Sequence, residues 1–214
     1  MSWITTATGQ DLDLAMPRPG QINIKDIAHS LAQLNRFTGH ASRPYSVAEH
    51  SLLVCDIATN NLQLDVHGQL AALLHDAHEA YCGDLHTPGK QAIGQPWYDF
   101  ERNLERSVHS AFAINAASRA HHDAIKRADL MALDIEHRDL MPKTARAWPV
   151  LSGVVCIPTI RLDSVFRAKH MQWQDWRDEF LQRYHELDYA RNQLLFGCSR
   201  HDGDTLHPAI FEAL

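Results

Sequence analysis

A histidine and an aspartate lie side by side in an otherwise apolar stretch, Leu73-Leu74-His75-Asp76-Ala77. Imidazole nitrogens and carboxylate oxygens are both ligands for Zn, Mn, Co or Fe. Burying a polar group without a partner costs roughly 2–7 kcal/mol, so the pair needs either a hydrogen-bond network or a metal ion. For an isolated His-Asp pair in a helix the network is the commoner solution, and the rest of the chain must decide between the two.

Two more residues of the same chemical kind interrupt apolar stripes elsewhere. His50 is followed two and three residues later by leucines, and Asp129 has an alanine before it and a leucine after it. Helical bundles build metal sites from side chains on facing helices. The sequence therefore predicts one divalent metal ion (Co, Mn, Zn, Mg or Fe) bound by His50, His75, Asp76 and Asp129.

These residues are positioned by a series of predicted helices, whose apolar residues recur at helical spacing. The helices are expected at about 25–35, 47–60, 65–82, 97–113, 118–140, 161–169 and 173–195. Ser46, with Glu49 three residues later, forms a capping-box pattern before the second helix. Gly83 is expected to end the third helix, and Thr87, just before a proline, to cap a short helix after it.

Strand signals are weak by comparison. Residues 3–6 and 21–24 fit a small N-terminal hairpin, and 154–157 carries a further short strand pattern. Prolines and a glycine predict a long loop over 142–160, with a tail at 198–214. The chain is therefore expected to be an all-α bundle, with a short irregular or hairpin N-terminal segment. We expect a single domain over 1–214, with its core at about 25–140 and C-terminal helices at about 161–195.

The composition is ordinary for a globular domain. Of the 214 residues 45% are hydrophobic, and the net charge of −6 argues against a protein dedicated to polymeric nucleic acid. No apolar run reaches the roughly 18 residues of a membrane span, and the N-terminus lacks a signal-peptide pattern. The four cysteines form no CxxC pair, which is typical of reduced thiols. We expect a cytoplasmic protein without a membrane partner, and its 15 histidines favour the search for a metal site.

The order His, His-Asp, Asp resembles the signature of the HD-domain metal-dependent phosphohydrolases. Five blocks of the chain, in order, are similar to motifs of the bacterial 5′-deoxyribonucleotidase branch of that family. The blocks are Asn35-Arg36-Phe37, Ser46-Val47-Ala48-Glu49-His50-Ser51, His75-Asp76-Ala77-His78-Glu79, Gly83-Asp84-Leu85-His86-Thr87-Pro88 and Lys126-Arg127-Ala128-Asp129. The resemblance covers about residues 25–140. It implies the HD-domain bundle, a nucleotide substrate and a homodimer.

The resemblance also implies roles for residues around the metal. Arg36 would bind phosphate through its rigid fork, and Asp84 would accept a hydrogen bond from the sugar 3′-hydroxyl. Glu79 lies four residues after His75, so a continuous helix would place both on one face, with Glu79 as general acid or base. Thr87 and Lys90 could support phosphate at the next helix start. Without the resemblance, each of these residues could equally be an ordinary surface or turn residue.

Four residues distinguish the predicted substrate pocket from that of the family, and one of them is His86, which replaces a proline. Phe37 stands where the family has a tryptophan that helps to exclude the ribose 2′-hydroxyl, and phenylalanine is smaller and lacks the indole N–H. His78 replaces a serine. His40 has no counterpart, but its closeness to Arg36 in sequence makes it a candidate phosphate contact.

Three functions remain open from the sequence. The leading hypothesis is hydrolysis of a deoxyribonucleoside 5′-monophosphate to the nucleoside and phosphate. The nearest rival is a deoxynucleoside triphosphate triphosphohydrolase that releases tripolyphosphate, for which extra cations such as Lys90 would be needed. The third is a non-catalytic nucleotide sensor, which would not need the complete ligand set together with Glu79.

Overall fold

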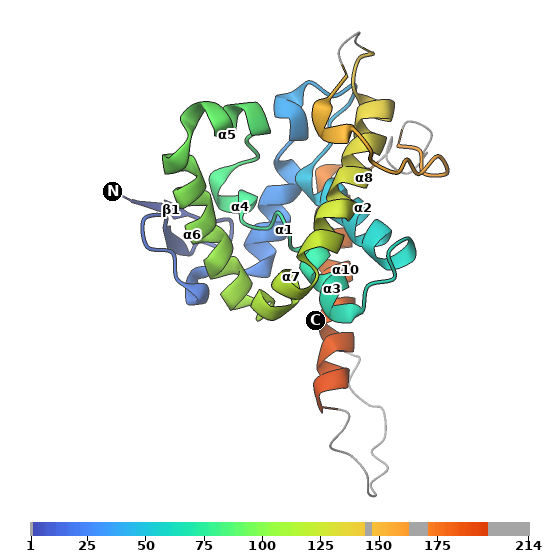
Figure 1. The fold of residues 1–214 in the computed structure, drawn as a ribbon. Helices are drawn as coiled ribbons and strands as arrows, with labels where there is room; N and C mark the ends of the chain where they lie inside the picture. The colour runs from blue at the N-terminus through green and yellow to red at the C-terminus, as the bar shows by residue number, and fades with distance from the viewer. Residues whose placement is uncertain (1, 144–146, 163–170, 197–214) are drawn as a thin grey trace, which may run out of the picture.

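The protein is a bundle of helices with a small β-hairpin at its N-terminus, as the sequence predicts (Figure 1). The computed structural model describes residues 2–143, 147–162 and 171–196. Its α-helices are α1 (Ile24–Gln33), α2 (Val47–Asn60), α3 (Val66–Leu73), α4 (Glu79–Cys82), α5 (Thr87–Ile93), α6 (Gln95–Ala111), α7 (Asn115–Ala120), α8 (His122–Leu140) and α10 (Trp173–Phe196). Short 3-10 helices are η1 (Pro19–Gln21), η2 (Arg36–Gly39) and η3 (Pro149–Leu151).

The N-terminal hairpin differs from the predicted one in its second strand. Strand β1 (Trp3–Thr5) pairs antiparallel with β2 (Asp11–Asp13), and not with residues 21–24. A tight turn with Gly9 at φ +83° reverses the chain soon after β1, so the nearest extended residues become the partner. Residues 21–24 instead end η1 and begin α1.

Helix α2 is the central element of the bundle. Its residues are buried without interruption from Val47 to Cys55, so it is surrounded by other helices. It packs against α1, α3, α8 and α10. Ser46 caps its first turn by accepting a hydrogen bond from the Glu49 amide, as predicted.

The predicted helix over 65–82 is broken, and the break falls at the His-Asp pair. Helix α3 ends at Leu73, and tight turns connect it to α4, which begins at Glu79. The His75 ring donates a hydrogen bond from Nδ1 to the Ala72 carbonyl oxygen, at 2.9 Å. This bond competes with the backbone amides for the same acceptor at the end of the helix. Gly83 then ends α4 with φ +84°, in agreement with the sequence.

Other boundaries also differ from the prediction. His86, and not Thr87, caps α5, because its ring Nδ1 accepts the Gly89 amide hydrogen at 3.0 Å. The helix expected over 118–140 is interrupted at His121, which separates α7 from α8. Within the described part of 142–160 the only regular element is η3, so the expected strand at 154–157 is absent there. Most of the helix predicted at 161–169, and the tail at 198–214, lie outside the described residues.

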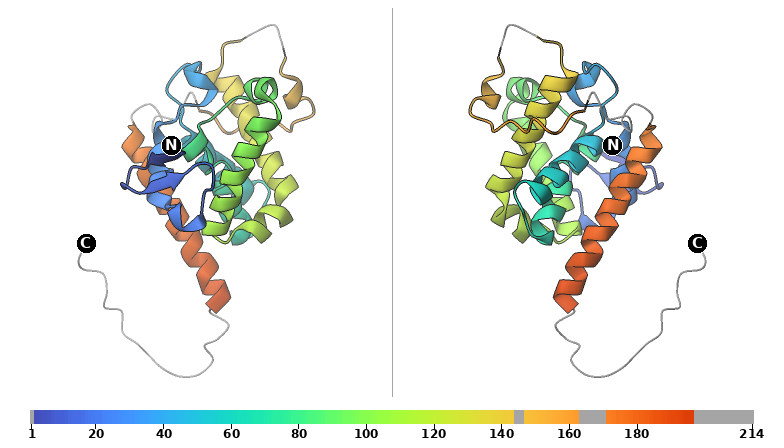
Figure 2. Two further views of the ribbon diagram at one scale, coloured as in Figure 1. Left: turned by 90° about the vertical axis from the view of Figure 1, so that its left-hand side faces the viewer. Right: turned by 90° about the vertical axis from the view of Figure 1, so that its right-hand side faces the viewer.

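Helix α10 lies along one side of the molecule, and its C-terminal end extends beyond the other helices (Figure 2). It packs mainly against α1 and α3. Phe180 anchors it as a fully buried side chain in the larger of the two apolar cores. No helix in the described part of the chain is both long enough and apolar enough to span a membrane.

Candidate metal centre

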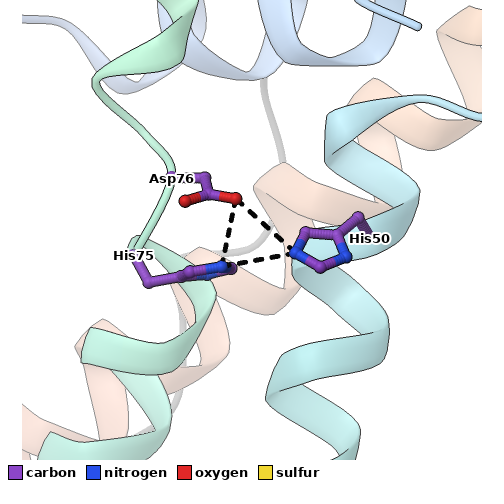
Figure 3. A group of neighbouring side chains, drawn as sticks. All are labelled: His50, His75 and Asp76. Atoms are coloured by element: carbon purple, nitrogen blue, oxygen red, sulfur yellow. Dashed lines mark hydrogen bonds and ion pairs between the residues drawn. The ribbon is translucent and has the colours of Figure 1, made fainter. Parts of the chain in front are cut away.

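His50, His75 and Asp76 converge in the middle of the bundle, where their ligand-type atoms all lie within 4.8 Å of one another (Figure 3). The His50 Nε2 atom lies 3.3 Å from His75 Nε2 and 3.5 Å from Asp76 Oδ2. Asp76 Oδ2 is 3.1 Å from His75 Nε2. The His50 side chain is fully buried, whereas that of Asp76 is 20% exposed, so the group is open to solvent on one side. These buried residues could hold a metal ion.

Asp129 approaches the same point from α8. Its Oδ1 atom lies 3.4 Å from His50 Nε2, and its Oδ2 accepts a hydrogen bond from Lys126 at 2.7 Å. The four residues singled out in the sequence therefore come together from α2, the α3–α4 connection and α8. The carboxylates stay ionised: burial raises the pKa of Asp76, but His75, His50 and Arg36 outweigh it and hold that pKa well below its usual range.

The Nδ1 atoms of both imidazoles already have hydrogen-bond partners within the protein. His50 Nδ1 is 2.5 Å from Glu136 Oε1, and His75 Nδ1 is 2.9 Å from the Ala72 carbonyl oxygen. Each Nδ1 therefore carries a proton, and the Nε2 atoms are the nitrogens available to a metal ion. Burial and Arg36 lower the pKa of His50, but Glu136 and Asp129 outweigh them and raise it to about 9, so a positive charge is favoured at this point. This donor set suits a divalent metal held by histidines with outer-shell partners.

Glu136 is a functional residue that the sequence analysis missed. It is fully buried, accepts a hydrogen bond from the Tyr45 hydroxyl at 3.0 Å and pairs with Arg36 Nη2 at 3.2 Å, besides holding His50. Burial raises its pKa, but Arg36 and His50 outweigh this and lower it. The available signal was its spacing: Glu136 follows Asp129 by seven residues, nearly two full turns on the same helix face.

Arg36 lies at the edge of the centre, immediately after α1. Its Nη1 atom is 3.7 Å from Asp76 Oδ2, and its Nη2 atom forms an ion pair with Glu136. Burial lowers the pKa of the guanidinium, but Glu136 and Asp76 outweigh it and raise that pKa above its usual value. The next two residues, Phe37 and Thr38, adopt left-handed backbone angles with φ of 56° and 52°, which is uncommon for residues with a Cβ.

Phe37 forms an aromatic wall beside this arginine. The Arg36 Cζ atom lies 5.4 Å from the centroid of the Phe37 ring. The ring packs in turn against Trp148, with centroids 6.1 Å apart, and Trp148 lies 4.4 Å from the His137 ring. Trp148 belongs to the loop predicted over 142–160, so part of that loop reaches the neighbourhood of the centre.

Glu79 lies near the centre, although not for the reason expected. The break before α4 removes the argument that Glu79 and His75 share one helical face. Its carboxyl group is nevertheless buried close to Asp76 and Asp84: burial, followed by these two carboxylates, raises the pKa of Glu79 well above its usual value. This shift favours the protonated form of Glu79, which is the form that can act as an acid.

Asp84 follows the turn at Gly83 and is also close to the centre. Burial raises its pKa, Arg36 opposes the rise, and Asp76 adds to it. The remaining predicted binding residues lie farther out. His78 and Lys90 contact Glu101 of α6, at 3.4 Å and 2.6 Å.

His40 and Thr87 are exposed. Among the described residues, no hydrogen bond or ion pair connects either side chain to the centre.

Comparison with known proteins gives two relatives and no family model. No protein-family model matches the chain. An uncharacterized protein of Rhodobacter capsulatus is 42% identical over 139 residues, which cover 63% of this chain and 71% of the relative. The uncharacterized protein YfdR of Escherichia coli K12 is 34% identical over 155 residues, which cover 72% of this chain and 81% of YfdR. The chain belongs to the family of these two proteins. Because both members are uncharacterized, membership in the YfdR family adds no activity, and the function must be argued from the centre itself.

Proposed function

We propose that the protein is a metal-dependent phosphohydrolase of the HD-domain type, which hydrolyses deoxyribonucleoside 5′-monophosphates to the nucleoside and phosphate. The observation that carries this proposal is the pair of His50 and His75 Nε2 atoms, 3.3 Å apart beside two carboxylates, with both Nδ1 atoms engaged elsewhere. Such an arrangement suits a metal ion, because two imidazole nitrogens and two carboxylates approach one point while both Nδ1 atoms are held by partners in the surrounding protein.

His50, His75, Asp76 and Asp129 would hold the metal ion. A divalent ion held there would polarise a phosphoryl oxygen and would lower the pKa of a nearby water toward ~7. Two imidazoles and two carboxylates leave room for water and substrate, and the solvent-exposed side at Asp76 gives access to both.

The surrounding residues bind the substrate and supply a proton. Arg36, oriented by Glu136, binds a phosphoryl oxygen and stabilises the negative charge that develops there. Glu79, whose raised pKa favours the protonated form, donates a proton to the 5′-oxygen of the leaving nucleoside. Asp84 accepts a hydrogen bond from the sugar 3′-hydroxyl, and the Phe37 ring packs against the sugar and crowds its 2′ position.

The test is a substrate screen with product analysis. The purified protein is loaded in turn with Mn, Co, Mg or Zn and offered deoxynucleoside and ribonucleoside monophosphates and triphosphates. We expect inorganic phosphate from deoxynucleoside monophosphates. Release of tripolyphosphate instead would identify a triphosphohydrolase and overturn the monophosphate proposal. No turnover of any substrate by metal-loaded protein would favour a non-catalytic nucleotide sensor.

A further inference from the structure

A second group of metal-type ligands includes Glu79 and comes from the start of α4 and from α6, two helices that lie side by side (Figure 1). His78 directly precedes α4, Glu79 is the first residue of that helix, and Glu101 comes from the facing α6. The ligand-type atoms of these three residues all lie within 4.8 Å of one another. His78 and Glu79 are only 7% and 3% exposed, so the group is built into the protein and is not a surface cluster.

One oxygen of this group is without a partner. Glu79 Oε2 is buried and forms no hydrogen bond to any described residue. Leaving such a group unsatisfied costs about 1–3 kcal/mol. The cost indicates that something other than the described residues satisfies this carboxyl group.

Lys90 of α5 supplies the only cation that the described residues place among these ligands. Its Nζ atom lies 2.6 Å from Glu101 Oε1 and 3.9 Å from Glu79 Oε1. The lysine side chain is 22% exposed, and its flexible stem allows the ammonium group to move into solvent. A positive charge is therefore already favoured at this point, and a divalent ion could take its place.

We propose that His78, Glu79 and Glu101 form a second divalent-cation site, separate from the centre at His50, in which the ion competes with the Lys90 ammonium group. One imidazole and two carboxylates make a ligand set that Zn, Mn and Co accept. The ion binds the oxygen of Glu79 that has no partner among the described residues. The site itself does not depend on the proposed function.

One consequence does rest on the proposed function. An ion bound to Glu79 removes the proton that this residue would donate to the leaving group. The second ion is therefore inhibitory, and activity should rise and then fall as the concentration of the metal increases.

The site is tested by counting bound Mn²⁺ through the free-ion signal in electron paramagnetic resonance, which requires no turnover. The wild type and the surface control Glu186→Gln should bind two ions per chain. Glu101→Gln should lose the second ion and keep the first, whereas Asp129→Asn should lose the first and keep the second. Lys90→Met removes the competing ammonium group and should tighten the second site several-fold.

Comparing Glu101→Gln with Lys90→Met distinguishes loss of the site from misfolding. The first substitution should weaken binding of the second ion, and the second should strengthen it, whereas misfolding would only weaken binding. Equal ion counts in the wild type and Glu101→Gln, or a second site that Lys90→Met weakens, would overturn the proposal. For the inhibitory role, the fall in phosphate release at high Mn²⁺ should disappear in Glu101→Gln. A fall that persists in this variant would contradict inhibition while leaving the ion count, and hence the site, unaffected.

Discussion

At the scale of single residues, the chemistry of the centre depends on which atom of each side chain is already occupied. His50 and His75 both use Nδ1 within the protein, and this directs both Nε2 atoms to one point. Asp76 and Asp129 bring their oxygens to the same point, where the nearby imidazoles keep them ionised. Each residue should therefore be needed for metal binding and not only for stability.

Replacing Asp129 by asparagine should reduce bound metal and abolish hydrolysis, because an anionic ligand is lost from the inner coordination shell. Elemental analysis of the purified variant, together with an activity assay, measures both effects. Asp123→Asn is the matched control, since Asp123 lies on the same helix with its side chain fully exposed, and it should behave as the wild type. Full activity in Asp129→Asn would remove this residue from the site.

Replacing Glu79 by glutamine separates proton donation from metal binding at the main centre. The variant should keep the ion at His50, but its rate should fall by about 10²–10⁴-fold, as expected when a general acid is removed. The rate constant is measured at saturating substrate, and Glu186→Gln serves as the surface control. Glu79 would be excluded as the acid if the variant turned over at the wild-type rate.

At the scale of elements, the centre depends on two places where regular helix stops. The turns between α3 and α4 present His75 and Asp76 together, which a straight helix would place about 100° apart around its axis. The left-handed residues of η2 turn the chain directly after Arg36. Strained backbone of this kind persists where the surrounding structure holds it, and functional sites are common among such places.

Thr38→Gly should stabilise the protein, because a left-handed residue with a Cβ costs about 1–2 kcal/mol and glycine does not have this cost. The gain is partly offset by the greater freedom of glycine in the unfolded chain, roughly 0.5–1 kcal/mol. A melting temperature higher by a few degrees is expected. Thr38→Ala retains the Cβ and should show no such gain, and equal melting temperatures in the two variants would show that η2 is not strained.

Phe37→Ala should raise activity on ribonucleotides relative to deoxyribonucleotides, because removing the ring relieves crowding at the 2′ position. The measurement is kcat/KM for dAMP and AMP in wild type and variant. Asp84→Asn is the comparison, and it should weaken both substrates alike, since both sugars carry a 3′-hydroxyl. If the ratio of the two values does not change in Phe37→Ala, the ring does not line the sugar pocket.

At the scale of the whole molecule, the centre joins parts of the chain that are distant in sequence. Glu136 of α8 holds His50 of α2 and Arg36 after α1, so three segments meet at one buried carboxylate. The metal ligands add the α3–α4 connection to this junction. A bound ion therefore links helices across both apolar cores of the protein.

Loading with metal should consequently raise the melting temperature of the whole protein. An ion at 100 times its dissociation constant stabilises the native state by about 2.7 kcal/mol. For a chain of this size that corresponds to about 5–10 °C. The comparison is between chelator-treated and Mn²⁺-loaded protein in a thermal melt. Asp129→Asn should lose the part of the shift that comes from the ion at His50, and a shift of undiminished size in this variant would place the stabilising ion elsewhere.

The sequence by itself determined the fold class and the four residues that meet at the candidate metal centre. Helix α2 is recognisable from its cap at Ser46 and its apolar run, because both are local patterns with a direct backbone consequence. His50, His75, Asp76 and Asp129 are recognisable for a similar reason: each is a polar ligand where the pattern calls for an apolar residue. Such signals lie within a few residues of the position that they describe.

Only the tertiary structure decided the partners of these residues and the shape of the backbone around them. Glu136 lies 86 residues from His50 and 100 from Arg36 in the chain, so no local pattern connects them. Glu101 and Trp148 were missed for the same reason. The break after Leu73 also escaped prediction. It accompanies the hydrogen bond from the His75 ring to a helix carbonyl oxygen, and His75 has this orientation in a centre that forms only when distant helices pack together.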